Sequence, residues 1–317
     1  MNIKPYIELA RIDHWFKNAF MVVGILMAVF YQPGILGPGS VAQLALAVLA
    51  TCIVASSNYV LNEILDAPTD REHPSKVARP IPAGRAAVRV AWLEWLLLSA
   101  AGLCLAFQIG VTFGLAALSL WTMALIYNVP PVRTKEVAYL DVLTESVNNP
   151  IRLLLGWFAL LSDRLPPVSL LLSYWAVGAF FMAAKRFAEL RTIGDRTRAA
   201  RYRRSFERYD EHNLLASMFF YVAVCAFFGG IFIVRCKLEL VLCVPLIAGL
   251  FTYYLRLGLR NNSPVQAPEK LYRERGFFLY GLVCFLCFAV LLFTHIPSLY
   301  ELFRVQAPGA TALWTIG

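Results

Sequence analysis

The chain alternates long apolar runs with short polar links, a pattern typical of proteins that cross a membrane many times. A spanning helix needs about 20 mostly apolar residues, and an α-helix satisfies its backbone hydrogen bonds internally, as lipid requires. The pattern therefore predicts an all-α integral membrane protein with nine transmembrane helices, in a single domain that covers residues 1–317. The nine runs of roughly spanning length lie at residues 15–33, 41–66, 90–108, 110–128, 139–161, 167–186, 213–234, 238–257 and 276–296.

The overall composition agrees with that pattern. The 317 residues are 59% hydrophobic and 15% charged, with a mean hydropathy of +0.61. These values are too apolar for an ordinary soluble domain. The composition therefore excludes most soluble protein classes and places the chain in a lipid bilayer.

The basic residues are distributed unevenly between the links. Most of the 29 lysines and arginines lie before the first run or in links that follow even-numbered runs. Because cytoplasmic links carry an excess of Lys and Arg, we predict a cytoplasmic N-terminus and an external C-terminus. The net charge of +9 has two interpretations, a solvated face that meets anionic lipids or a binding surface for a polyanionic substrate.

Polar residues recur every four positions at the end of the second run. Asn58, Asn62, Asp66 and Asp70 share one helical face, because four steps of about 100° nearly complete a turn. Pro68 lacks a backbone donor and clashes with the preceding turn. We therefore predict that the helix bends or ends near Asp66 and that Asp70 lies in the following loop.

Carboxylate and amide oxygens at this position favour a magnesium site. Mg²⁺ usually binds one or two carboxylates together with substrate phosphates, so Asn62, Asp66 and Asp70 are candidate ligands. The next residues include His73 and Arg85 as well as Lys76 and Arg79, which suit phosphate oxygens. The alternative is a solvated helix end with a mixed-charge loop, which explains any one of these residues but not the two clusters together.

The combined pattern resembles the first aspartate-rich motif of the UbiA superfamily of intramembrane prenyltransferases. The similar positions are Asn62, Asp66, Asp70, His73-Pro74, Lys76, Arg79-Pro80 and Pro82-Ala83-Gly84. Where the family commonly has Asp after the first Asn, this chain has Glu63. The resemblance implies nine helices around a central cavity with cytoplasmic capping loops. It also implies a location in a bacterial plasma (inner) membrane, with the active site facing the cytoplasm.

A second segment, YNVPPVRTKEVAYLDV, follows the fourth run. Tyr127, Arg133, Lys135 and Asp141 resemble a Tyr-Ser-x-x-x-Arg/Lys segment of the same family. Pro130-Pro131 would equally mark an ordinary turn before a new helix.

A third segment, FFMAAKRFAELR, departs from the common family pattern. Most members carry D-x-x-x-D at the end of the sixth run, whereas this chain has Lys185 and Glu189. An i,i+4 ion pair and a cytoplasmic anchor are the ordinary explanations. The functional hypothesis is that the donor substrate carries more phosphate groups than a prenyl diphosphate does. Further cations that suit such a donor follow at Arg203, Arg204 and Arg208.

The Lys-Arg-Phe-Ala-Glu-Leu sequence resembles the polyprenyl-phosphate phosphoribosyltransferase branch, which makes decaprenylphosphoryl-5-phosphoribose. Arg152 falls where that branch carries an arginine in the fifth span. The resemblance implies a Mg²⁺ cofactor and assigns Asp66, Asp70 and Glu189 to the catalytic centre. It assigns to substrate binding Asn58, Asn62, Lys76, Arg79, Tyr127, Arg133, Lys135, Arg152, Lys185 and Arg186.

Three functional classes remain after these observations. A Mg²⁺-dependent transferase is favoured, moving either a 5-phosphoribosyl group from phosphoribosyl diphosphate to a polyprenyl phosphate or a prenyl group from a polyprenyl diphosphate to an aromatic acceptor. A transporter for anionic solutes would place its polar groups near the membrane midplane, and a lipid-binding structural protein has no use for the Asn and Asp residues. The expected partners are a polyprenyl lipid, a diphosphate-containing donor and the bilayer, without nucleic acid; a homo-oligomer is left open.

Overall fold

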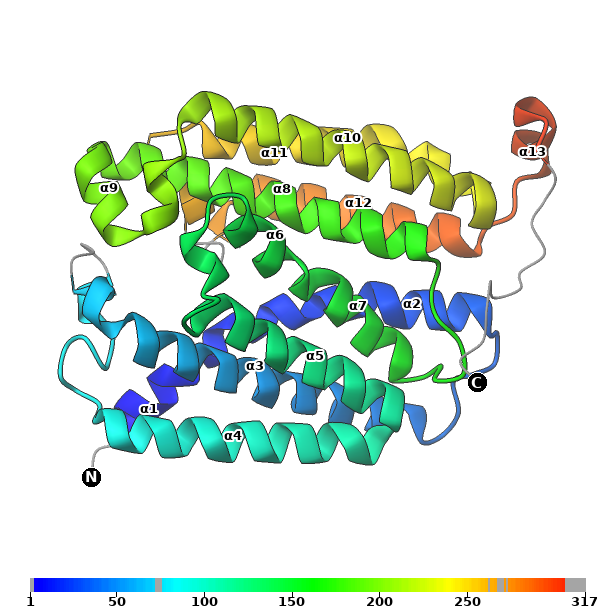
Figure 1. Ribbon diagram of the computed structural model, residues 1–317. Helices are drawn as coiled ribbons and strands as arrows, with labels where there is room; N and C mark the ends of the chain where they lie inside the picture. Colours follow the sequence, from blue (N-terminus) through cyan, green and yellow to red (C-terminus); the bar gives the residue numbers. More distant parts are fainter. Residues whose placement is uncertain (1–2, 72–75, 262, 267–270, 272, 306–317) are drawn as a thin grey trace. The chain divides into compact units, whose positions relative to one another are not determined.

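The secondary-structure elements are all helices in the part of the chain that the computed structural model describes, residues 3–71, 76–261, 263–266, 271 and 273–305 (Figure 1). Eight helical stretches in these residues are long and apolar enough to span a membrane. The predicted all-α membrane fold is confirmed. The eight stretches are Lys4–Tyr31, Ser40–Asp70, Val88–Ile109, Val111–Asn128, Val168–Ile193, Glu211–Cys236, Leu238–Gly258 and Arg275–Phe293.

The predicted fifth span is divided into two short helices. Residues 139–161 form α6 (Leu140–Ser146) and α7 (Asn148–Phe158), which meet at Val147. Pro150 explains the break, because it has no N–H and its ring conflicts with the carbonyl four residues earlier, that of Ser146. The prediction of one continuous helix here is therefore wrong in this detail.

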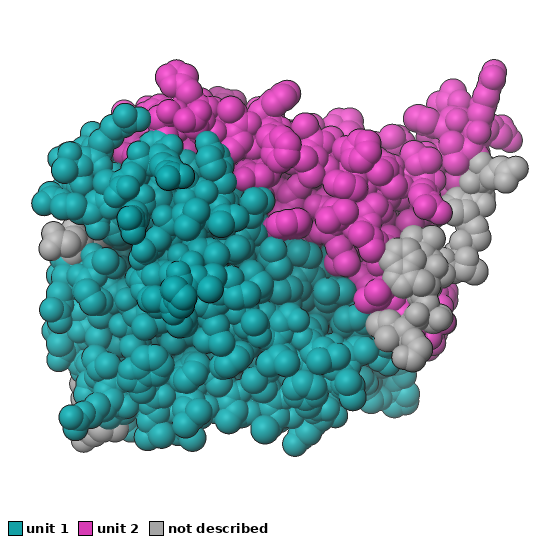
Figure 2. All heavy atoms as spheres, in the orientation of Figure 1, with its two compact units in different colours: residues 1–25, 35–162, 193–209 teal, residues 26–34, 163–192, 210–317 magenta. Residues whose placement is uncertain are grey.

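The chain divides into two compact units, shown in different colours in Figure 2. The first unit contains residues 1–25, 35–162 and 193–209, and the second contains residues 26–34, 163–192 and 210–317. The single domain over residues 1–317 stays a prediction, as does the orientation of the two termini.

The first unit contains most of the residues selected from the sequence. Three of its helices, α3, α4 and α5, run side by side, and α7 packs against α5 (Figure 1). Helix α2 (Met21–Tyr31) begins in this unit and continues into the second. The remaining elements of the first unit are α1 (Lys4–Leu9), η1 (Ile12–Phe20), α3 (Ser40–Asp70), η2 (Lys76–Ala78), α4 (Val88–Ile109), α5 (Val111–Asn128), η3 (Thr134–Glu136), α6, α7, α9 (Arg196–Tyr202) and η4 (Arg204–Glu207).

Helix α3 continues through Pro68 to Asp70, so the prediction that Asp70 lies in a loop is wrong. The physical reason is packing around the end of the helix. Val60, Ile64 and Ala67 are buried in one cluster with Leu9 and with residues of the following loop and α4. Burial of this apolar face offsets the single hydrogen bond that the proline removes. Asp70 consequently remains on the helical face of Asp66.

The second unit is a set of long helices packed through aromatic side chains. Phe180 and Phe181 of α8 contact Phe251 and Tyr254 of α11, with ring centroids as close as 4.6 Å. Its elements are α8 (Val168–Ile193), α10 (Glu211–Cys236), η5 (Leu238–Cys243), α11 (Val244–Gly258), η6 (Pro264–Gln266), α12 (Arg275–Phe293) and α13 (Pro297–Phe303).

Candidate active site

Two side chains of α3 are in direct contact at the centre of the candidate site. Asn62 Nδ2 donates to Asp66 Oδ2 at 3.0 Å and to Asn128 Oδ1, at the end of α5, at 2.7 Å. Both amide hydrogens of Asn62 are thereby used, which leaves its Oδ1 as an acceptor. The predicted shared face of Asn62 and Asp66 is observed. Asn58, one turn earlier, donates to Leu120 O at 3.0 Å.

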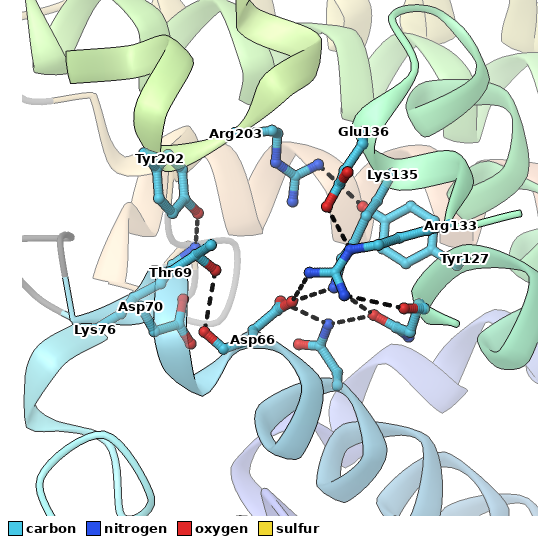
Figure 3. Close-up of polar contacts among 12 residues, drawn as sticks. Asp66, Thr69, Asp70, Lys76, Tyr127, Arg133, Lys135, Glu136, Tyr202 and Arg203 are labelled. Atoms are coloured by element: carbon cyan, nitrogen blue, oxygen red, sulfur yellow. Dashed lines mark hydrogen bonds and ion pairs between the residues drawn. The ribbon is translucent and has the colours of Figure 1, made fainter. Parts of the chain in front are cut away.

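Asp66 is neutralised by two cations from the loop that follows α5 (Figure 3). Lys135 Nζ donates to Asp66 Oδ1, and Arg133 Nη2 lies 3.2 Å from the same oxygen. Lys135 Nζ also donates to Asn128 Oδ1 at 2.9 Å. Asp66 of α3 and the segment after α5 therefore form one charged cluster.

Lys135 is a buried cation, with 4% of the residue exposed. Burial lowers its pKa to about 8, although the carboxylate of Asp66 acts in the opposite direction. Arg133 adopts a left-handed φ of 26° and also pairs with Glu136. Such a conformation persists only where the surroundings determine it. The loop therefore holds both cations over Asp66 at some conformational cost.

The loop after α3 contributes a second carboxylate–cation pair. Asp70 is 2% exposed and pairs with Arg79, while Lys76 donates to the hydroxyl of Tyr202 on α9. Lys76, Arg79 and Asp70 thus all belong to the first unit. His73 and Pro74 lie outside the described residues.

Glu63 has a structural position that its sequence context did not reveal. Its buried carboxylate accepts from Arg11 Nη2 and from the backbone N–H of Ile81, each at 3.1 Å. These contacts tie the N-terminal segment and the loop carrying Arg79 to α3. Glu63 serves as an anchor for the loop in this arrangement.

Tyr127 contacts Arg203, which the sequence motifs do not assign to the site. Its hydroxyl accepts from Arg203 Nη1 at 3.1 Å, and the same nitrogen lies 3.4 Å from Asp141 Oδ2. Asn128 was missed altogether. An amide residue next to Tyr127 at the end of an apolar run is its only signal in the sequence.

Arg152 lies apart from this cluster. Its Nε donates to Asn18 Oδ1 at 3.0 Å, and Asn18 in turn donates to Cys52 Sγ at 3.1 Å. Cys52 precedes Asp66 by four turns of α3, which corresponds to about 20 Å along the axis. Arg152 is 8% exposed, and no carboxylate in the described part of the chain pairs with it. The structure therefore places Arg152 at a different depth from Asp66.

The third predicted segment belongs to α8 in the second unit. Arg186 Nη1 donates to Glu189 Oε2 at 2.7 Å, and both side chains are buried. Glu189 thus has Arg186, three positions earlier, as an ion-pair partner. The proximity of Lys185, Arg186 and Glu189 to Asp66 stays a prediction.

The donor set around Asp66 is chemically suited to Mg²⁺. It offers the carboxylates of Asp66 and Asp70 and the amide oxygen of Asn62, and hard oxygen ligands with one or two carboxylates are what Mg²⁺ prefers. Among the described residues, no group of three or more His, Cys, Asp and Glu side chains could hold a metal. Substrate oxygens would therefore have to complete the coordination.

The fold and the site together define a multispanning α-helical membrane protein with a cluster of paired carboxylates and cations at the end of one spanning helix. The chain belongs to the UbiA prenyltransferase family, whose sequence model matches residues 19–282. The resemblance seen in the sequence is confirmed.

The chain is also similar to individual members of the family. The chain is 32% identical over 211 residues to decaprenyl-phosphate phosphoribosyltransferase of Mycolicibacterium smegmatis, which covers 65% of this chain and 63% of the relative. It is 30% identical over 213 residues to nodulation protein NoeC of Azorhizobium caulinodans, covering 67% and 65%. The aligned regions thus span less than two thirds of either relative.

Solved structures confirm the fold. A UbiA homologue from Archaeoglobus fulgidus, bound to GPP and Mg²⁺, matches with a TM-score of 0.66 and 18% identity, covering 88% of this chain and 99% of that one. A structure of digeranylgeranylglyceryl phosphate synthase matches with a TM-score of 0.62 and 17% identity, covering 92% and 98%.

Proposed function

We propose that this membrane protein is a Mg²⁺-dependent transferase that moves a 5-phosphoribosyl group from phosphoribosyl diphosphate to a polyprenyl phosphate. One observation carries the proposal: the Asp66 carboxylate lies against Lys135 and Arg133, with the pair of Asp70 and Arg79 on the same helical face. This arrangement offers carboxylates for a metal and cations for phosphate oxygens. Similarity to phosphoribosyltransferases over about two thirds of the chain supports the choice of donor.

The reaction requires one bond to form and one to break. An oxygen of the lipid phosphate attacks C1 of the ribose, and the C1–O bond to diphosphate breaks with its electron pair leaving on the diphosphate. Mg²⁺, held by Asn62, Asp66 and Asp70, would neutralise charge that develops on the leaving group.

The protein's own cations prepare the site for the donor. Without substrate, Lys135 and Arg133 are paired with Asp66, so the cluster carries little unbalanced charge. When the donor binds, its phosphate oxygens replace the carboxylate as partners of these cations, and Asp66 becomes available as a metal ligand. Charge-assisted bonds from both cations then orient the diphosphate for departure.

The second candidate is prenyl transfer from a polyprenyl diphosphate to an aromatic acceptor. It is favoured by the fold match to a homologue bound to GPP and Mg²⁺. Purified protein is incubated with Mg²⁺ and one of two substrate pairs, phosphoribosyl diphosphate with decaprenyl phosphate or a prenyl diphosphate with 4-hydroxybenzoate. Product from the first pair alone supports the proposal, and product from the second alone overturns it.

Lys185 provides a test of donor choice. We expect Lys185→Ala to raise the apparent KM for phosphoribosyl diphosphate about tenfold to hundredfold, because a charged hydrogen-bond partner contributes about 1.5–3 kcal/mol. The KM for the lipid should be nearly unchanged in the same steady-state assay. A raised lipid KM with an unchanged donor KM would instead assign Lys185 to the acceptor phosphate.

Arg152→Gln is expected to leave the donor KM nearly unchanged. Because Arg152 is bonded through Asn18 to Cys52, about 20 Å along α3 from Asp66, it is too far to share the diphosphate held there. We expect Arg152→Gln to change the donor KM less than about twofold. Steady-state kinetics with the donor varied tests this, and a tenfold rise in the donor KM would contradict it.

A further inference from the structure

Arg203 lies at a break between two short helices that pack with the first unit. The segment 196–209 contains α9 and η4, and Arg203 between them is extended, with φ −148° and ψ 118°. Its side chain is 13% exposed, whereas Arg201 on the preceding turn is exposed to solvent. Arg203 is therefore turned toward the interior of the unit, whereas Arg201 is turned toward solvent.

Contacts on both sides of Arg203 fix the segment to the rest of the first unit. Immediately before it, the hydroxyl of Tyr202 accepts from Lys76. After it, Tyr209 OH donates to Asp141 Oδ1 at 2.6 Å, and Ser205 Oγ lies 3.4 Å from Asp141 Oδ2. Asp141 is fully buried. The backbone around Arg203 is thus anchored to the loop that follows α3 and to α6.

The charge of Arg203 acts on the centre of the candidate site. It interacts electrostatically with both Asp66 and Lys135, and Figure 3 shows it on the same side of the cluster as Tyr127 and Lys135. Its contact with Asp141 is long, at 3.4 Å, and Asp141 receives a much shorter hydrogen bond from Tyr209. Asp66 already has two cations. A third cation beside them is favourable when an anion with several oxygens occupies the site.

We propose that Arg203 is a further donor-binding residue, which contacts the diphosphate from the segment 196–209, and that Asp141 positions it through Tyr209. This inference rests on the proposed function and deepens it. The diphosphate is held jointly by Lys135, Arg133 and Arg203. The segment thereby contributes directly to substrate affinity.

Binding of inorganic diphosphate tests the role of Arg203. Full-length protein in nanodiscs is titrated with diphosphate and Mg²⁺ in a calorimeter. We expect Arg203→Gln to weaken binding about tenfold to hundredfold and the matched control Arg201→Gln to change it less than about twofold. Unchanged affinity in Arg203→Gln overturns this inference alone. A wild-type protein that fails to bind diphosphate overturns the proposed function and this inference with it.

Two further variants separate positioning from folding. Arg203→Lys should recover part of the lost affinity if the cation itself matters. Tyr209→Phe should raise the donor KM about threefold to tenfold with little change in kcat, and the double variant Arg203→Gln/Tyr209→Phe should bind no more weakly than Arg203→Gln. A full additional loss in the double variant, or no recovery in a normally melting Arg203→Lys, contradicts the proposal.

Discussion

Replacing Asp66 with asparagine is expected to lower the transfer rate about 100-fold or more while the protein still inserts and folds. The amide has no negative charge for a divalent cation, and several kcal/mol of charge stabilisation at the leaving group would be lost with the metal. Lys135 and Arg133 would also lose the anion that holds them in place before the donor binds. The rate is measured with each candidate substrate pair at saturating Mg²⁺.

Asp163→Asn is the control for this substitution, because Asp163 is an exposed aspartate that pairs with the adjacent Arg164. It should retain the wild-type rate. The melting temperature of both variants must be measured, since removal of one partner from a buried ion pair is destabilising. A wild-type rate in Asp66→Asn would refute the assignment of Asp66 to the metal site.

Gly156→Ala and Gly24→Ala are expected to cause the largest losses of stability. A Cβ on Gly24 of α2 would lie 2.7 Å from the backbone nitrogen of Trp157, and even closer to Leu153 O. A Cβ on Gly156 of α7 would lie 2.8 Å from the carbonyl carbon of Met21. These neighbours are backbone atoms, which cannot rotate away, so one helix must move. Overpacking of this kind costs about 1–3 kcal/mol.

Gly230→Ala in α10 is the matched control, because a Cβ there would meet no atom within 4 Å. Alanine is the better helix former by about 1 kcal/mol in a helix interior. Thermal melting in detergent should therefore show lower midpoints for Gly24→Ala and Gly156→Ala, and an equal or higher midpoint for Gly230→Ala. Equal midpoints in all three variants would contradict the close contact of α2 and α7.

The spanning helices and the carboxylates of α3 were predictable because both depend on local patterns. Apolar length identifies a membrane helix, and four-residue spacing places Asn62 and Asp66 on one face. The predicted end of α3 is wrong because the local pattern shows only the hydrogen bond that Pro68 removes. The packing of Ile64 and Ala67, which keeps the helix intact, involves distant segments of the chain.

Contacts between distant segments could not be predicted in the same way. Glu63 binds Arg11 and the backbone of Ile81, and nothing in its own neighbourhood distinguishes this anchor from a metal ligand. Arg203 is one of several arginines in a basic link. Only the fold shows that it turns toward Tyr127 while Arg201 faces solvent.

The most direct test of the proposed function is to trace the 5-phosphate of the donor into the lipid product. Purified protein is incubated with Mg²⁺, decaprenyl phosphate and phosphoribosyl diphosphate labelled on its 5-phosphate, and the lipid extract and the released diphosphate are quantified. We predict that the label enters the lipid fraction with one diphosphate released for each labelled lipid, and that Asp66→Asn abolishes both. Label that stays in the aqueous phase, from protein that forms a prenylated product from a prenyl diphosphate and 4-hydroxybenzoate, would contradict it.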